Sequence, residues 1–294
     1  MASKHIPVRG EKKRFFGSGV LEVIKSLPER TRDILSDRYN LFGKHPKGKT
    51  LDAIGKRYGI TRERVRQIVQ FAMKSARDRG TSDVDEAVRR VEAILMDRGG
   101  IFAKERLVSD LGISDPAEAG ALDFVLDFSD RFVPISPDRY ALQSVSLAEF
   151  DRAVFHAVVE TLEEMFAETK KPKKLTAIRK HVKDALEREL DAKHLEAYLV
   201  SSATMEHNPL GEWGLATWGE IRPRSAGERA YLVLRHAGEP LHFSEIAREI
   251  DNLKLSTRPA NPQTVHNELI KSPKFALLGR GRYGLSEWKR ARKA

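Results

Sequence analysis

The sequence contains no cysteine and no long hydrophobic run. The absence of cysteine among 294 residues excludes disulfides, cysteine-ligated zinc, iron–sulfur clusters and thiol nucleophiles. The longest uninterrupted apolar stretch, Ala230–Leu234, is far too short to span a bilayer. No apolar stretch follows the basic residues at the start, so we expect no secretory signal. These features predict a cytoplasmic protein with no membrane partner.

Basic charge is concentrated towards the two ends of the chain. Residues 1–80 carry 20 basic and 8 acidic side chains, and residues 222–294 carry 15 and 7. Between them, residues 81–150 carry 7 basic and 14 acidic side chains, and residues 151–221 carry 10 and 13. Two basic ends around an acidic centre suit a polyanion at one or both ends, with the centre free for other contacts. The alternative is ordinary solvated surface charge.

Residues 50–69 predict two helices separated by a tight turn. Thr50 is suited to cap the first helix, and Gly59 is suited to the left-handed backbone at its end. Thr61 is then placed to cap a second helix. A capped helix, a glycine turn and another capped helix form a helix-turn-helix.

Two further helices are predicted before this motif. Residues 20–27 predict a short helix, and Pro28 is suited to open a second that runs to about Tyr39 with Ile34 and Leu35 inward. We therefore assign residues 20–80 to one N-terminal domain. Residues 1–19 are basic and lack periodicity, which predicts a flexible lead-in.

The second helix of the motif has two different faces. The apolar residues that should pack inward are Val65, Ile68, Val69 and Ala72. Polar residues lie opposite them within the two turns that would enter a major groove: Arg62, Glu63, Arg66 and Gln67. Arginine can bridge O6 and N7 of guanine, glutamate can accept from N4 of cytosine, and glutamine can pair with adenine or reach a phosphate. We add Thr61, Arg64 and Lys49 to this predicted DNA-binding set.

Residues Thr50–Gln67, and more loosely Pro28–Arg77, closely resemble region 4, the promoter-reading domain of bacterial primary-type sigma factors. The match is closest over Thr61–Ile68, within the recognition helix of that family. The resemblance implies that the four polar residues contact the −35 promoter element and that the domain docks on the β flap of RNA polymerase. Because 19 residues precede the motif and all three tryptophans lie far downstream, we expect no promoter-melting domain.

A second arrangement of predicted helices and strands occurs three times after the N-terminal domain. The recurring ends of the three copies are Arg139-Tyr140-Ala141-Leu142, Glu212-Trp213-Gly214-Leu215 and Arg282-Tyr283-Gly284-Leu285. Three helices and a two-stranded hairpin are predicted in each copy, which is typical of a winged helix, with boundaries at 81–147, 148–221 and 222–290. The sequence thus predicts a mainly α fold with small β wings, in which a helix-turn-helix precedes three winged-helix modules.

The elements of each module follow from its apolar pattern and caps. Helices are predicted near 84–97, 104–111 and 116–127, then at 154–166, 175–181 and 191–200, and then at 227–236 and 243–250. Asn261 opens one more helix, with Val265, Leu269 and Ile270 facing inward. The first wing is predicted at 132–135 and 140–143, the middle wing ends at Ala216, and the last wing lies at 275–278 and 282–285.

The last module resembles the HARE-HTH winged-helix domain, which is similar to the N-terminal domain of the RNA polymerase delta subunit. The resemblance spans residues 225–288 and is carried by residues 237–243, 262–265 and 279–288. It implies a DNA-binding or polymerase-bound module. The candidate contacts to nucleic acid or polymerase are Gln263, Asn267, Lys271, Lys274, Arg280 and Arg282.

No catalytic, cofactor or metal site is predicted. Residues 279–284 fit G-x-G-x-x-G, but they lead into a strand, whereas a dinucleotide site needs a helix N-terminus. The nine histidines include no His-Glu-x-x-His spacing. The basic cluster at 170–174 is expected to be a solvated loop, with a phosphate contact as the alternative.

These features predict a non-enzymatic, nucleoid-associated transcription factor that binds double-stranded promoter DNA and RNA polymerase. One alternative is a polymerase-sequestering or recycling factor whose sigma-like module competes for the β flap. Another is the specificity subunit of a DNA-processing system, because HARE-type modules also accompany nucleases.

Overall fold

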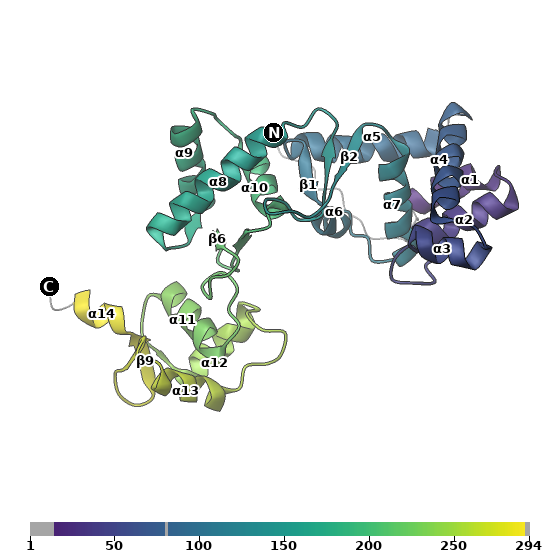
Figure 1. Ribbon diagram of the computed structural model, residues 1–294. Helices are drawn as coiled ribbons and strands as arrows, with labels where there is room; N and C mark the ends of the chain where they lie inside the picture. Colours follow the sequence, from purple (N-terminus) through teal and green to yellow (C-terminus); the bar gives the residue numbers. More distant parts are fainter. Residues whose placement is uncertain (1–14, 80–81, 292–294) are drawn as a thin grey trace, which may run out of the picture. The chain divides into compact units, whose positions relative to one another are not determined.

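The computed structural model describes residues 15–79 and 82–291 (Figure 1). The chain divides into two compact units. Unit 1 comprises the described residues up to Ser136 together with Gln143–Phe150. Unit 2 comprises Pro137–Leu142 and the described residues from Asp151 onward. The lead-in predicted at 1–19 lies outside the described residues as far as position 14, and residues 15–19 belong to a helix.

Unit 1 begins with the four helices expected of the N-terminal domain. They are α1 (Phe15–Lys25), α2 (Glu29–Tyr39), α3 (Leu51–Tyr58) and α4 (Arg62–Arg79). The first of them starts five residues earlier than predicted. Pro28 lies at the N-cap position of α2 rather than in its first turn. The core between the helices consists of fully buried aliphatic side chains, among them Val20, Ile34, Leu35, Ile54 and Val65.

The N-terminal helices share their core with the module that follows them. That module contains α5 (Ser82–Asp97), α6 (Lys104–Asp110) and α7 (Pro116–Phe128). The Tyr39 hydroxyl donates to Asp127 at 2.9 Å, and the Tyr39 ring meets that of Phe124 edge-on at 5.4 Å. A Cβ at Gly120 would lie 1.7 Å from the carbonyl oxygen of Tyr39, so only glycine fits there. Although the sequence suggests a boundary at 80/81, both sides of it belong to unit 1.

The remaining helices belong to unit 2. They are α8 (Arg152–Thr169), α9 (Leu175–Leu186), α10 (Ala192–Ser201), α11 (Ala226–Ala237), α12 (Phe243–Asn252), α13 (Pro262–Lys271) and α14 (Ser286–Ala291). None of the helices in residues 15–79 and 82–291 is long and apolar enough to cross a membrane.

Each of the three modules carries a small antiparallel sheet. The first contains β1 (Ile101–Ala103), β2 (Phe132–Ile135) and β3 (Ser144–Leu147) in the order β1-β3-β2. The second contains β4 (Lys173–Lys174), β5 (Met205–His207) and β6 (Glu212–Leu215) in the order β4-β6-β5. The third contains β7 (Leu241–His242), β8 (Phe275–Leu277) and β9 (Arg282–Leu285) in the order β7-β9-β8. The sequence predicted two strands each, because the strands before α6, α9 and α12 are too short to show periodicity.

The predicted strand at 140–143 is wrong. The three sheets share one register, in which Leu147, Leu215 and Leu285 pair with Phe132, Met205 and Phe275 respectively. In this register, Val145-Ser146-Leu147 is the segment equivalent to Trp213-Gly214-Leu215 and Tyr283-Gly284-Leu285. Tyr140-Ala141-Leu142 is not.

Tyr140 belongs instead to the short segment Pro137–Leu142, which lies in unit 2. The Asp138 carboxylate accepts from the backbone N–H groups of both Tyr140 and Ala141 at 2.8 Å, which makes a turn. The Tyr140 ring stacks on His156 at 4.1 Å, and Ala141 forms a β-bridge with Ser202. The tetrapeptide at 139–142 therefore resembles the other two in sequence but is not equivalent to them in structure.

One core prediction for α13 also fails. Val265 and Leu269 are buried, but Ile270 is 64% exposed. Residues four apart share one face of a helix, whereas the next residue is turned by about 100°, which directs Ile270 away from the core.

Candidate nucleic-acid interface

In the helix-turn-helix, a local side-chain cap fixes the start of each of the two helices. The Thr50 hydroxyl accepts from the Ala53 N–H at 3.2 Å, and the Thr61 hydroxyl accepts from the Arg64 N–H at 3.1 Å. Between them, Gly59 ends α3 in the left-handed region at φ +66°. These contacts confirm the predicted caps and turn.

Gly55 sets how closely α3 approaches the turn. A Cβ at this position would lie 2.6 Å from the carbonyl oxygen of Ile60, and the N–H of Ile60 donates to the carbonyl oxygen of Gly55 at 3.0 Å. The close approach holds the start of α4 against α3. The position of Gly59 directly after α3 marks it in the sequence, whereas nothing marks Gly55, because its constraint depends on a contact five residues away.

The helix α4 has the two faces that the sequence predicts. Val65, Val69 and Ala72 are buried, and Ile68 is half-buried. The exposed side of its first two turns carries five of the predicted residues together: Arg62, Glu63, Arg64, Arg66 and Gln67.

A polar network joins most of these exposed side chains. The Arg66 guanidinium donates to both carboxylate oxygens of Glu63, at 2.9 and 2.6 Å, and to Gln70 at 3.0 Å. Gln67 donates to Glu63 at 3.5 Å and accepts from Arg64 at 3.2 Å. The hydrogen bond from Arg66 lowers the pKa of Glu63 and raises that of Arg66. The carboxylate is thus kept ionised, as an acceptor of hydrogen bonds.

Arg62 stands apart from that network. Within the part of the chain that the structure describes, its side chain makes no hydrogen bond or ion pair. It borders an open depression at the turn, together with Asp52, Lys56 and Thr61. Its guanidinium is therefore available to a ligand without loss of an internal contact.

Lys49, which was added to the predicted DNA-binding set, pairs with Asp37 on α2. Its ammonium lies 3.0 Å from the Asp37 carboxylate, and its backbone N–H donates to the Asp37 carbonyl at 2.9 Å. Arg57 binds the second carboxylate oxygen of Asp37 at 2.5 Å. Asp37 thus ties the loop before α3, and α3 itself, to α2. Sequence reasoning missed Asp37 and Arg57, since no local pattern marks this tertiary contact.

Residues 23–78 match the family model of sigma-70, region 4. The match runs from the second half of α1 through nearly all of α4 and includes every predicted residue of the motif. The N-terminal domain is of the sigma region 4 type. The match confirms the resemblance drawn from the sequence for this part of the chain. Domains of this type bind DNA and act in transcription.

The candidate contact residues of the last module differ in whether they are bound within the module. Gln263, Asn267 and Lys271 are exposed on α13, and Arg280 is exposed on the loop between β8 and β9, at φ +46°. Arg282, by contrast, donates to the Pro240 carbonyl at 2.6 Å. The structure therefore ties Arg282 to its own module and leaves the α13 side chains at the surface.

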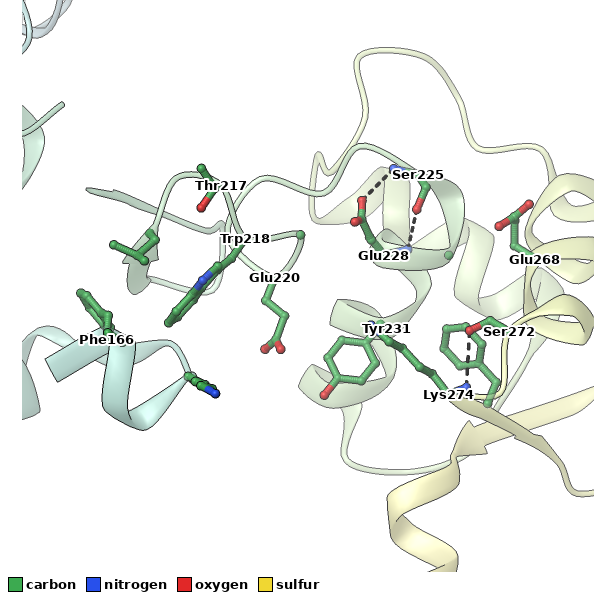
Figure 2. A pocket seen from close by; sticks show the side chains of 16 residues that line it. Phe166, Thr217, Trp218, Glu220, Ser225, Glu228, Tyr231, Glu268, Ser272 and Lys274 are labelled. Carbon is green, nitrogen blue, oxygen red and sulfur yellow. Dashed lines mark hydrogen bonds between the residues drawn. The ribbon is translucent and has the colours of Figure 1, made fainter. Parts of the chain in front are cut away.

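Lys274 lines a pocket of about 680 Å³ in unit 2, which the sequence did not indicate. Phe166 and Trp218 meet edge-on at 5.6 Å on one side of it, and Tyr231, Ser272 and Lys274 lie on the other (Figure 2). The Lys274 ammonium is 5.5 Å from the centre of the Tyr231 ring. Burial raises the pKa of the Tyr231 hydroxyl to about 12, so this hydroxyl stays neutral at physiological pH.

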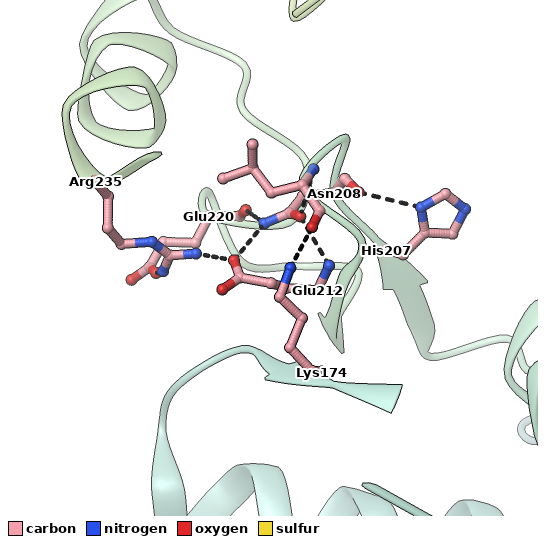
Figure 3. A network of polar contacts seen from close by, with 7 residues as sticks. Lys174, His207, Asn208, Glu212, Glu220 and Arg235 are labelled. Carbon is pink, nitrogen blue, oxygen red and sulfur yellow. Dashed lines mark hydrogen bonds and ion pairs between the residues drawn. The ribbon is translucent and has the colours of Figure 1, made fainter. Parts of the chain in front are cut away.

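Unit 2 contains a polar network of its own, which links β6 to α11. Arg235 binds the carboxylates of both Glu212 and Glu220 (Figure 3). The fully buried Asn208 donates to Glu212 and to the Glu220 carbonyl, both at 3.0 Å. These side chains satisfy one another, so we assign this network a structural role. Among the described residues, no group of three or more His, Asp or Glu side chains is placed to hold a metal ion.

Proposed function

We propose that this chain is a non-enzymatic transcription factor that reads −35-like promoter DNA with the first two turns of α4. One observation carries the proposal: Arg62, Glu63, Arg66 and Gln67 stand together on the exposed side of a doubly capped helix-turn-helix of the sigma region 4 type. In such motifs the N-terminal turns of the second helix contact base edges in the major groove. The chain acts on double-stranded DNA in the nucleoid.

Each of the four side chains has a matching base edge. Arg62 and Arg66 are suited to O6 and N7 of guanine, and the ionised Glu63 is suited to N4 of cytosine. The Glu63–Arg66 pair fixes both side chains before DNA arrives, which reduces the entropy lost on binding. Gln67 adds a contact to adenine or to a phosphate.

RNA polymerase is the second partner in this proposal, with the β flap as the docking site of the N-terminal domain. The three following modules act as winged helices, of which the acidic first two make protein contacts or act as spacers. The last, HARE-HTH-like module holds DNA or polymerase through Gln263, Asn267, Lys271, Lys274, Arg280 and Arg282. Its net positive charge and the exposure of these side chains support the assignment.

The proposal is tested by replacing Arg62 and Glu63 singly with alanine in the full chain. Binding to a −35-like duplex and to a scrambled duplex is measured by fluorescence anisotropy. Each substitution should reduce the preference for the −35-like duplex by about 5- to 150-fold, which corresponds to about 1–3 kcal/mol per bidentate base contact.

A matched control lies on α5, where Glu86 and Arg89 form an exposed ion pair at 2.8 Å with the same three-residue spacing as Glu63 and Arg66. Glu86→Ala and Arg89→Ala should leave the preference unchanged. Base reading by α4 is excluded if the Arg62 and Glu63 variants discriminate as well as the parent.

The hydrogen bonds that Glu63, Arg66 and Gln67 already make to one another favour a second candidate function, in which the domain competes for polymerase without binding DNA. A complex with many phosphate contacts weakens by about 10³- to 10⁵-fold between 50 and 200 mM salt. A flat salt response, together with co-purification of RNA polymerase, would favour sequestration over promoter reading.

A further inference from the structure

Phe71 is an aromatic side chain that α4 leaves in solvent. It is 75% exposed, the highest value among the large hydrophobic side chains of the described residues. Its neighbours along α4 divide cleanly, since Val69, Ala72 and Met73 are buried whereas Gln70 and Lys74 are exposed. Phe71 thus belongs to the solvent face of the helix and contributes nothing to its core.

Phe71 continues the row of side chains to which the proposed function assigns base contacts. Glu63, Gln67 and Phe71 are spaced by four residues, and residues four apart are neighbours on a helix surface. At a rise of 1.5 Å per residue, Phe71 lies about 6 Å beyond Gln67 along the axis. That distance is the rise of roughly two base pairs at about 3.4 Å each. The next turn of the reading face therefore presents an aromatic ring in place of a polar group.

The major groove offers such a ring a methyl group, the C5 methyl of thymine. Phenylalanine is among the side chains that make apolar contact with it. Lys74, three residues further on the same face, is placed to reach the flanking phosphates. We propose that Phe71 is a specificity-determining residue that recognises a thymine methyl roughly two base pairs beyond the base contacted by Gln67. This inference rests on the proposed function.

The experiment removes the methyl group from the DNA and the ring from the protein in turn. Each thymine of the −35-like duplex and its flanks is replaced singly by uracil, which keeps the pairing edge and lacks only the methyl. Affinities of the full-length parent, Phe71→Ala and Met96→Ala are measured by fluorescence anisotropy. Met96 is the control, because it is 55% exposed but lies on α5.

For the parent and Met96→Ala, uracil at one position should weaken binding about fourfold, as expected for one buried methyl group. Phe71→Ala should bind the thymine and uracil duplexes equally at that position. The inference is overturned if no uracil replacement affects the parent, or if Phe71→Ala keeps the parent's ratio. It is also overturned if Phe71→Ala changes capture of purified RNA polymerase but not this ratio, since Phe71 would then face a protein.

The two proposals fail in different ways. If the parent does not distinguish −35-like from scrambled DNA, promoter reading is wrong and the role of Phe71 falls with it. If the parent distinguishes them and loses this ability on Arg62→Ala, but the thymine-to-uracil ratio is insensitive to Phe71, only the Phe71 inference is wrong.

Discussion

The carboxylate of Glu118 on α7 accepts a hydrogen bond of 2.5 Å from the backbone N–H of Phe16, at the start of α1 and 102 residues earlier in the chain. It also accepts from the N–H of Gly17 at 3.0 Å. Helix starts leave such N–H groups without partners, and here the partner comes from another module. Both N–H groups and the carboxylate are buried, so water cannot replace either side of the contact.

Glu118→Ala should destabilise unit 1 by about 2–3 kcal/mol, because buried donors to a charged acceptor lose their partner. All three tryptophans lie in unit 2, at 213, 218 and 288, so tryptophan fluorescence follows that unit while far-UV circular dichroism follows both. In urea titrations of the full chain, the dichroism transition should shift and the fluorescence transition should not. Glu105→Ala, an exposed substitution on α6, should shift neither.

Gly55→Ala should impair DNA binding more than Gly59→Ala does. A methyl group at Gly55 meets the Ile60 carbonyl and must push α3 away from the start of α4, whereas a methyl group at Gly59 meets nothing within 4 Å. Gly59→Ala should cost about 1 kcal/mol of stability for its left-handed backbone and keep the preference for −35-like DNA. Gly55→Ala should lose most of that preference in anisotropy titrations. Equal effects of the two substitutions would show that the close approach does not set the geometry of α4.

The stability of the last module should depend on the protonation of Glu228. Its carboxylate closes a capping box at the start of α11, accepting from the N–H groups of Ser225 at 3.0 Å and Arg224 at 2.7 Å. The bond from Ser225 contributes most to lowering the pKa of Glu228 below its ordinary value of 4.5. A carboxyl group with a lower pKa in the folded state stabilises the fold above pH 4.5, and this contribution is lost as the pH falls through the lowered pKa.

Glu228→Gln should therefore cost about 1 kcal/mol at pH 7, and the difference from the parent should shrink towards pH 3. Urea unfolding followed by tryptophan fluorescence at several pH values measures it. Glu239→Gln, an exposed substitution in the same module, is the control and should show no such pH dependence. A constant difference for Glu228→Gln across this range would rule out a role for its charge.

Arg235→Ala should loosen the link between β6 and α11. It leaves the carboxylates of Glu212 and Glu220, whose side chains are 20% and 32% exposed, without their shared cation. We expect a loss of about 2 kcal/mol, less than for a fully buried pair, and faster proteolysis within residues 216–225. Arg222→Ala breaks an ion pair with Glu206 in which the arginine is 58% exposed, and it should cost under about 1 kcal/mol. Unchanged proteolysis of Arg235→Ala would show that this network does not hold α11.

The helix-turn-helix could be predicted from the sequence because everything that defines it is local. The Thr50 and Thr61 hydroxyls each accept from an N–H group three residues further on, and the Gly59 N–H donates to the carbonyl oxygen of Gly55, four residues back. The apolar spacing of α4 selects its buried face. The same locality made the exposed cluster of Arg62, Glu63, Arg66 and Gln67 predictable.

The tetrapeptide around Tyr140 shows where local patterns mislead. Its residue types match those of two segments that do form strands. Here, however, the Asp138 carboxylate accepts from the Tyr140 N–H and makes a turn, and the Tyr140 ring stacks on His156. The ion pair of Lys49 with Asp37 could not be read from the sequence in the same way, because it joins the loop before α3 to α2.

The chain's own order of residues therefore determined where α3 begins and ends, where α4 begins, and which side of α4 meets solvent, since caps and periodicity act over one or two turns. The tertiary structure alone decided that α7 packs on α1 and α2, that Glu118 completes a distant helix end, and that two- and three-residue strands join each sheet. Those contacts depend on groups brought together from far along the chain, and their pairing leaves no short-range pattern to read.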